Sequence, residues 1–213
     1  MIYIASYRRV VPAVVLLFAA TLGCRAPSGS ASNGPPVPNT ALARAENDRA
    51  FACLNEGKYE EAEELINKSL AADVMYGPAY NNLGLVHFHQ GKLYQAAWDF
   101  QNAAKLMPDQ PQPRNNLGLV FERAGQLDNA AAAYGKAHDM APDSAEYLGN
   151  LARAHVRRGD RDEQTRQLLE EVVYKDPRPD WSAWAREHLF AFTRASQPVT
   201  RPSAVEPQQD GSR

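Results

Sequence analysis

Apolar residues recur every three or four positions through the middle of this 213-residue chain, from about residue 40 to residue 178. Such spacing places the apolar side chains on one face of a helix. The apolar stretches come in pairs, and a short turn that holds a glycine separates the two members of each pair. The pattern therefore predicts an all-α fold built from helix-turn-helix units.

The pairs of stretches repeat with a period of 34 residues. Glycines keep this period at Gly57, Gly91, Gly125 and Gly159. Apolar residues keep it too, at Ala62, Ala96 and Ala130 and at Ile66, Phe100 and Tyr134. The period divides the region 40–178 into four units, which are 43–76, 77–110, 111–144 and 145–178. Because one unit of this size cannot bury its apolar face alone, we expect the units to stack into a solenoid.

Residue size within the period indicates how the helices pack. Small residues stand at corresponding positions, namely Gly84, Gly118, Ala96 and Ala130. We expect the two helices of a unit to approach closely there, while the larger Phe100 and Tyr134 fill the space between units. Unit 4 holds one additional residue within 160–175, so its second helix should be shifted or irregular.

Unit 2 carries the residue classes of a known repeat at Tyr80, Leu83, Gly84, Gly91, Ala96, Phe100, Ala103 and Pro108. Through these residues and their period, the chain resembles the tetratricopeptide-repeat (TPR) family over about two thirds of its length. Unit 1 departs from the family pattern at Glu46 and Arg49. The resemblance implies a right-handed solenoid of four repeats, in which the first helix of each unit lines a concave groove that binds protein or peptide partners.

An amphipathic segment, 179–195, follows the last unit. Its apolar and aromatic residues recur on one helical face, at Trp181, Trp184, Ala185, His188 and Phe192. Asp180 suits the N-cap position of this helix. The simplest role is a capping helix that covers the exposed face of unit 4. The alternative is a dimerisation helix, which would make the chain a homodimer.

Three asparagines occupy the same position in units 2, 3 and 4, and they are Asn82, Asn116 and Asn150. The TPR resemblance implies that such a ladder holds an extended peptide through its backbone. The chemistry agrees, since an asparagine amide both donates and accepts hydrogen bonds. The alternative is that these amides bind the neighbouring helix instead.

The resemblance places further residues along the same groove, and these are Asn47, Asp48, Phe51, Asn81, Leu85, Phe88, His89, Asn115, Leu119, Glu122, Arg123, Arg153 and Arg157. Its end is basic, and Arg123, Arg153 and Arg157 suit an acidic segment because a guanidinium binds a carboxylate through two hydrogen bonds. A solvated charged face is the alternative. Chaperone-binding members of the family hold a terminal carboxylate with cations where this chain has Gln112 and Asn116, so we do not predict that activity.

The N-terminal segment reads as an export signal. Arg8 and Arg9 precede an apolar run over residues 10–23, which is shorter than the ~20 residues that span a bilayer. Leu22-Gly23-Cys24 resembles the cleavage box of bacterial lipoproteins, although Thr21 stands where that family prefers leucine. The resemblance implies that residues 1–24 are a lipoprotein-type signal peptide and that Cys24 is lipidated. An uncleaved anchor, ordinary signal-peptidase cleavage and a cytosolic protein are the alternatives.

Two segments rich in Pro, Gly and Ser flank the helical region. Residues 25–39 should form a disordered tether and residues 196–213 a disordered tail, because neither holds enough apolar surface to order itself. The protein would thus face the periplasm of a bacterial cell envelope, held to the membrane by lipid. The formal net charge of −2 gives no basic field that would attract nucleic acid.

No residue pattern indicates catalysis, a cofactor or a metal. His87 and His155 stand two units apart, roughly 20 Å in a solenoid, which is too far to share a metal ion. Cys53 falls on the inward face of a helix and should be a buried small side chain, with no disulfide to Cys24. The sequence therefore predicts a non-catalytic scaffold that binds proteins. The alternative is a structural subunit that uses its capping helix and convex face.

Overall fold

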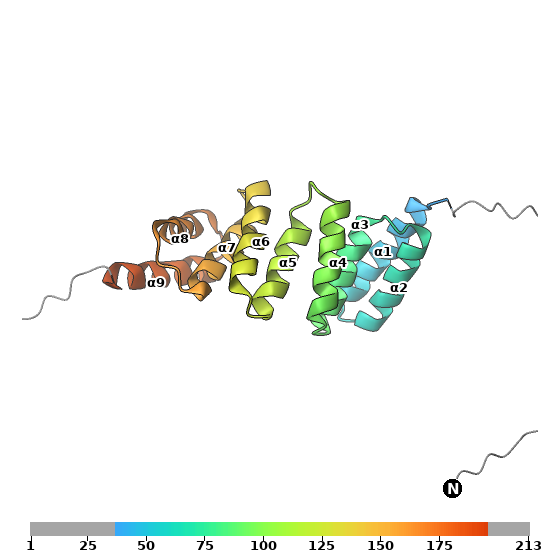
Figure 1. The fold of residues 1–213 in the computed structure, drawn as a ribbon, viewed down its shortest axis with the longest axis horizontal. Coiled ribbons are helices and arrows are strands. Elements are labelled where there is room, and N and C mark those ends of the chain that lie inside the picture. The colour runs from blue at the N-terminus through green and yellow to red at the C-terminus, as the bar shows by residue number, and fades with distance from the viewer. Residues whose placement is uncertain (1–36, 196–213) are drawn as a thin grey trace, which may run out of the picture. The chain divides into compact units, whose positions relative to one another are not determined.

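The computed structural model describes residues 37–195, with side chains through residue 192. The predicted signal peptide with Cys24, the tether up to residue 36 and the tail 196–213 lie outside the described residues. Over the described range the chain is all-helical, with nine α-helices and no strand (Figure 1). In chain order they are α1 Thr40–Asn55, α2 Tyr59–Ala72, α3 Gly77–His89, α4 Leu93–Leu106, α5 Gln112–Arg123, α6 Leu127–Met140, α7 Ala145–Arg158, α8 Glu163–Lys175 and α9 Pro179–Ala195.

The glycines of the period close the first helix of each unit. Gly57, Gly91, Gly125 and Gly159 have φ of +73°, +76°, +74° and +89°. This left-handed conformation strains a residue that carries a Cβ, so it explains why glycine returns every 34 residues. The turn that follows is tight, since the second helix of units 1 to 3 begins two residues after the glycine.

The small residues lie where the two helices of a unit meet, as predicted. A Cβ added at Gly84 would lie 2.6 Å from the ring atom Cε1 of Phe100, and one at Gly118 would lie 2.5 Å from Cδ1 of Tyr134. The side chains of Ala96 and Ala130 are fully buried. Glycine at these two positions therefore makes room for the aromatic ring of the second helix.

Three apolar clusters hold successive units together. One joins α1, α2 and α3 around Ile66, and another joins α4 to α5 through Phe100 and Val120. The largest runs from α6 to α9 and includes Tyr134 and Leu148. Each cluster crosses from one unit to the next, which is the packing of a solenoid. The predicted fold class is confirmed.

Unit 4 accommodates its additional residue in the turn. The helix α8 begins four residues after Gly159, rather than two, and it is a regular α-helix. Its N-cap is Asp162, whose side chain accepts a hydrogen bond from the backbone N–H of Thr165 at 2.8 Å. The second helix of unit 4 is therefore shifted, as predicted, but not irregular.

The capping helix α9 packs on α7 and α8. A Cβ at Gly149 would lie 2.9 Å from the ring of Trp181, and Ala185 is fully buried in the largest cluster. The prediction of Asp180 as the N-cap is wrong, because the helix begins at Pro179 and Asp180 lies in its first turn. Proline at a first helical position has the right φ and lacks only an N–H that has no helical partner.

Candidate functional site

A groove of about 700 Å³ lies over the first helices of units 1 and 2. The helix α1 contributes Asn47, Asp48 and Phe51, and α3 contributes Gly77, Pro78, Asn81 and Asn82. The opposite wall consists of residues 106–110 in the turn between α4 and α5, together with Gln112 of α5. We call this space the first-helix groove.

The predicted asparagine ladder forms hydrogen bonds between neighbouring units. The Nδ2 of Asn82 donates to Oδ1 of Asn47 at 2.9 Å. Asn116 donates to Asn81 in the same way at 3.0 Å, and Asn150 donates to Asn115 at 2.9 Å. Each pair is separated by 35 residues and joins the first helices of consecutive units. These amides therefore bind neighbouring helices, which is the alternative that the sequence left open.

These pairs still leave hydrogen-bonding capacity in the first-helix groove. A primary amide offers two N–H donors and two acceptor lone pairs, and one pairing uses only one of these four on each side chain. Asn81 is half-buried in the groove, and its Oδ1 is held by Asn116. The bond between units fixes the direction of the amide, so the remaining N–H groups of Asn81 have a defined orientation.

The predicted basic end of the groove is organised around a buried carboxylate. Nε and Nη2 of Arg153 each donate to Glu122 at 2.9 Å, and Nη1 of Arg157 donates to it at 2.7 Å. The hydroxyl of Tyr134 donates to the same carboxylate at 2.7 Å. Burial alone would raise the pKa of Glu122, but the hydrogen bonds from Arg153, Tyr134 and Arg157 outweigh it and lower the pKa to about 2.

The arginines of this end are therefore engaged within the fold. One carboxylate between Arg153 and Arg157 cancels one of their two charges. The guanidinium of Arg123 lies over the Phe88 ring, 5.0 Å from its centroid, and Nη1 donates to the Phe88 carbonyl at 3.2 Å. The three side chains link the first helices of units 2, 3 and 4, so no fully free basic clamp results.

Of the remaining predicted groove residues, Leu85 and Leu119 are half-buried and pack against the apolar clusters. The structure thus brings the predicted residues of units 1 and 2 into one groove and places those of units 3 and 4 outside it. The sequence analysis missed the wall formed by residues 106–110. Those residues belong to an irregular turn, where helical periodicity carries no signal.

The two histidines found by sequence have protein partners. Nδ1 of His87 lies 2.6 Å from Oδ2 of Asp99, and Nδ1 of His155 lies 3.0 Å from Oδ2 of Asp160. Burial raises the pKa of Asp99 to about 6, although the hydrogen bond with His87 opposes that rise. Cys53 is half-buried beside the first apolar cluster. Within residues 37–195 no group of His, Cys, Asp and Glu side chains is arranged to hold a metal ion.

Two family models described as tetratricopeptide repeat match the chain, one over residues 41–112 and the other over residues 121–186, and together they cover more than half of it. This chain is built from tetratricopeptide repeats. Proteins with this fold generally bind other proteins or peptides and are typically non-catalytic scaffolds. A comparison with curated protein sequences gives no match.

Solved TPR structures share the fold at low sequence identity. The first TPR domain of Spaghetti (RPAP3), bound to the HSP90 peptide SRMEEVD, has a TM-score of 0.55 at 19% identity over 58% of this chain and 98% of that one. YrrB, a TPR protein with an unusual peptide-binding site, has 0.58 at 20% identity over 70% and 76%. MamA from Desulfovibrio magneticus RS-1, from residue 41 to its end, has 0.52 at 18% identity over 73% and 78%.

Proposed function

We propose that this TPR protein is a non-catalytic adaptor that binds a segment of a partner protein in the first-helix groove. The observation that carries the proposal is the groove itself, about 700 Å³ in volume, with amide side chains from α1 and α3 beside Phe51. Amides that donate and accept match the N–H and C=O groups of an extended backbone. Phe51 is half exposed and gives an apolar side chain of the segment a surface to pack on.

The hydrogen bonds between units strengthen this proposal. The Asn82–Asn47 and Asn116–Asn81 bonds hold the groove amides in place before any partner arrives. A preorganised site loses less conformational entropy on binding than a mobile one. The peptide bound to the Spaghetti domain and the peptide-binding site of YrrB support a peptide ligand for a groove on this fold.

We test the groove with two surface substitutions, Asp48→Lys and Phe51→Ala, in one variant. Both side chains are exposed, so stability should not change, whereas capture of partner proteins from solubilised envelopes should weaken several-fold. The matched control is Glu60→Lys with Tyr94→Ala, which makes the same chemical changes at exposed positions outside the groove. Equal capture by both variants, with unchanged melting temperatures, would show that the first-helix groove is not the binding surface.

We further propose that the protein is exported and held in the bacterial cell envelope by lipid on Cys24. The support is the sequence of residues 8–24, in which two arginines, a short apolar run and Leu22-Gly23-Cys24 follow one another. None of the helices within residues 37–195 has the length and apolar character to cross a membrane. Cys24→Ser should release the protein from the membrane fraction without changing its helix content, and retention of that variant on membranes would contradict lipidation.

A homodimer is the second candidate, and one observation favours it. On the capping helix α9, Phe190 is 70% exposed although its neighbours Trp181 and Trp184 are half-buried. An exposed aromatic side chain at the end of a solenoid suits a second copy of the chain. Sedimentation of the wild type and of Phe190→Ser decides this, since a monomeric wild type excludes the dimer.

A further inference from the structure

A second groove of about 390 Å³ lies between α4 and α6, with α5 as its floor. Ala104 and Lys105 of α4 line it, with Leu117 and Phe121 of α5 and Ala132 and Lys136 of α6. We call it the α4–α6 groove. At 3.6 residues per turn, Leu117 and Phe121 lie on the side of α5 opposite Gln112, which lines the first-helix groove. The two grooves are therefore separate surfaces.

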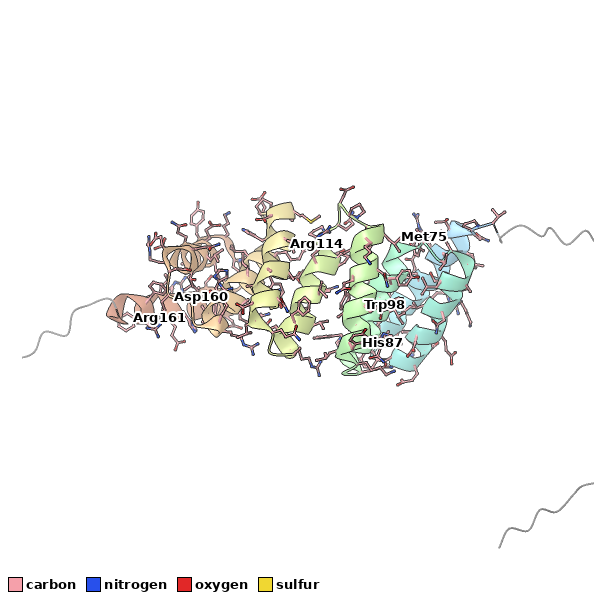
Figure 2. All side chains as sticks on the ribbon, viewed as in Figure 1. Met75, His87, Trp98, Arg114, Asp160 and Arg161 are labelled. Carbon is pink, nitrogen blue, oxygen red and sulfur yellow. The ribbon has the colours of Figure 1, made fainter. Side chains whose placement is uncertain are left out.

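Large side chains fill the corresponding space at the joint of units 1 and 2. One period before Ala132 stands Trp98, and one period before Arg114 stands Tyr80. The rings of Tyr80 and Trp98 meet edge to face with their centroids 6.2 Å apart. Figure 2 shows Trp98 on α4 and Arg114 on α5, from which the two joints can be compared. Where units 1 and 2 have an aromatic pair, units 2 and 3 have an alanine and an arginine.

Other positions of the period follow the same rule. Ala104 stands one period after Leu70, which packs against the first apolar cluster. At the joint of units 3 and 4, Leu148 stands one period after Arg114 and is fully buried. The α4–α6 groove is open because alanines replace the large residues that close this space at the other joints. Its floor, Leu117 and Phe121, remains half-buried rather than covered.

Three cations surround this apolar floor, one from each helix. They are Lys105, Arg114 and Lys136, and no carboxylate lines the groove. Neither lysine forms an ion pair with any described residue, and Arg114 uses Nη1 for the carbonyl of Gln110 at 3.1 Å. An apolar floor inside a ring of unpaired positive charge matches a ligand with the opposite arrangement, in which carboxylates flank a large apolar side chain.

We propose that the α4–α6 groove is a second docking surface, which takes a partner-protein segment whose large apolar residue is flanked by acidic residues. The apolar residue enters over Leu117 and Phe121, where the alanines leave room. The flanking carboxylates pair with Lys105, Lys136 and Arg114. A TPR protein with two such surfaces can hold two partner segments at once, one in each groove.

The test selects peptides from a random library on the full chain and then measures each selected peptide by fluorescence anisotropy. The decisive variant is Ala132→Trp, which gives α6 the residue that α4 has at Trp98 and should fill the groove. A second variant, Lys105→Glu with Lys136→Glu, reverses two exposed rim charges and should leave the fold intact. Its matched control is Lys68→Glu with Lys92→Glu, at exposed lysines outside the groove.

The expected result is a set of peptides rich in Asp and Glu around Phe, Leu or Trp. These peptides should lose affinity several-fold or more in Ala132→Trp and in the Lys105 and Lys136 variant, while binding the control and the Asp48 and Phe51 variant normally. Peptides that bind both groove variants as well as wild type would overturn the proposal. So would the loss of anionic vesicle or RNA binding in these variants with no peptide affected. Since the first-helix groove is tested by separate residues, either proposal can fail alone.

Discussion

Two buried carboxylates stand at different joints of this stack, and their partners differ in kind. Glu122, at the joint of units 3 and 4, receives hydrogen bonds from Arg153, Arg157 and Tyr134. Asp99, at the joint of units 1 and 2, has the ring of His87 at 2.6 Å, and Glu63 lies 3.9 Å beyond that ring. One carboxylate is surrounded by permanent cations, whereas the other depends on a side chain that itself titrates.

The comparison shows that burial alone does not set the protonation of a carboxyl group. Burial raises the pKa in both cases, because low polarity disfavours the charged form. Three donors overcome this at Glu122 and bring its pKa to about 2. One histidine does not overcome it at Asp99, whose pKa stays near 6, with Glu63 adding to the rise. The two joints should therefore respond differently to mutation and to pH.

The largest expected effect comes from removing the charge of Glu122. Glu122→Gln leaves Arg153 without its carboxylate inside the fold, and breaking a buried ion pair from one side costs about 3 kcal/mol or more. Denaturant unfolding followed by circular dichroism measures this loss. Glu171→Gln is the control, since Glu171 pairs with Lys175 on the surface and should cost at most about 0.5 kcal/mol. Equal losses in the two variants would show that Glu122 does not hold the joint together.

An effect of intermediate size should separate the two helix-pair contacts. Gly118→Ala and Gly84→Ala each place a Cβ against an aromatic ring, and overpacking of this kind costs roughly 1–3 kcal/mol. We expect the larger loss at Gly118, because the hydroxyl of Tyr134 is tied to Glu122 while the Phe100 ring has no such bond. Thermal melts of the two variants give the comparison.

A double-variant cycle sharpens this contrast. Tyr134→Phe frees the ring from Glu122, so Gly118→Ala should cost less in that background than in the wild type. If the two substitutions add without coupling, the hydroxyl is not what holds the ring in place.

The smallest effect should appear in the pH dependence of stability. The pKa of Glu122 is lowered from 4.5 to about 2, so its contribution is complete above about pH 4.5 and is lost as the pH falls toward 2. The pKa of Asp99 is raised from 3.8 to about 6, so its contribution is complete below about pH 4 and is lost as the pH rises through 6. Unfolding free energies of Glu122→Gln and Asp99→Asn, each subtracted from wild type across this range, should slope in opposite directions. Parallel slopes would contradict the assignment.

Much of the fold could be predicted from the sequence because the same local rules recur in each unit. The glycine at the end of a first helix needs a positive φ, and Gly84 and Gly118 need to be small because an aromatic ring lies against them. These requirements involve residues within one unit. They appear in the sequence as identities at a fixed period, where a single chain suffices to see them.

The candidate site could be predicted only in part. The sequence placed Asn47, Asp48, Phe51, Asn81 and Asn82 on the inner side of first helices, and these residues do line the first-helix groove. It did not show that the groove ends after unit 2, where the turn 106–110 forms the wall. A turn has no repeating face, so its direction follows from the packing of the units on either side.

The sequence by itself determined the period, the helix pairs and the residues that must be small, because each of these depends on neighbours within 34 residues. Only the tertiary structure decided which unit each polar side chain reaches. Asparagines 35 residues apart meet across every joint between repeats, and Glu122 meets Arg153 and Arg157 rather than solvent. Those contacts depend on the rotation and shift of one unit against the next. That offset is set by the summed packing of many side chains, so no single position in the sequence displays it.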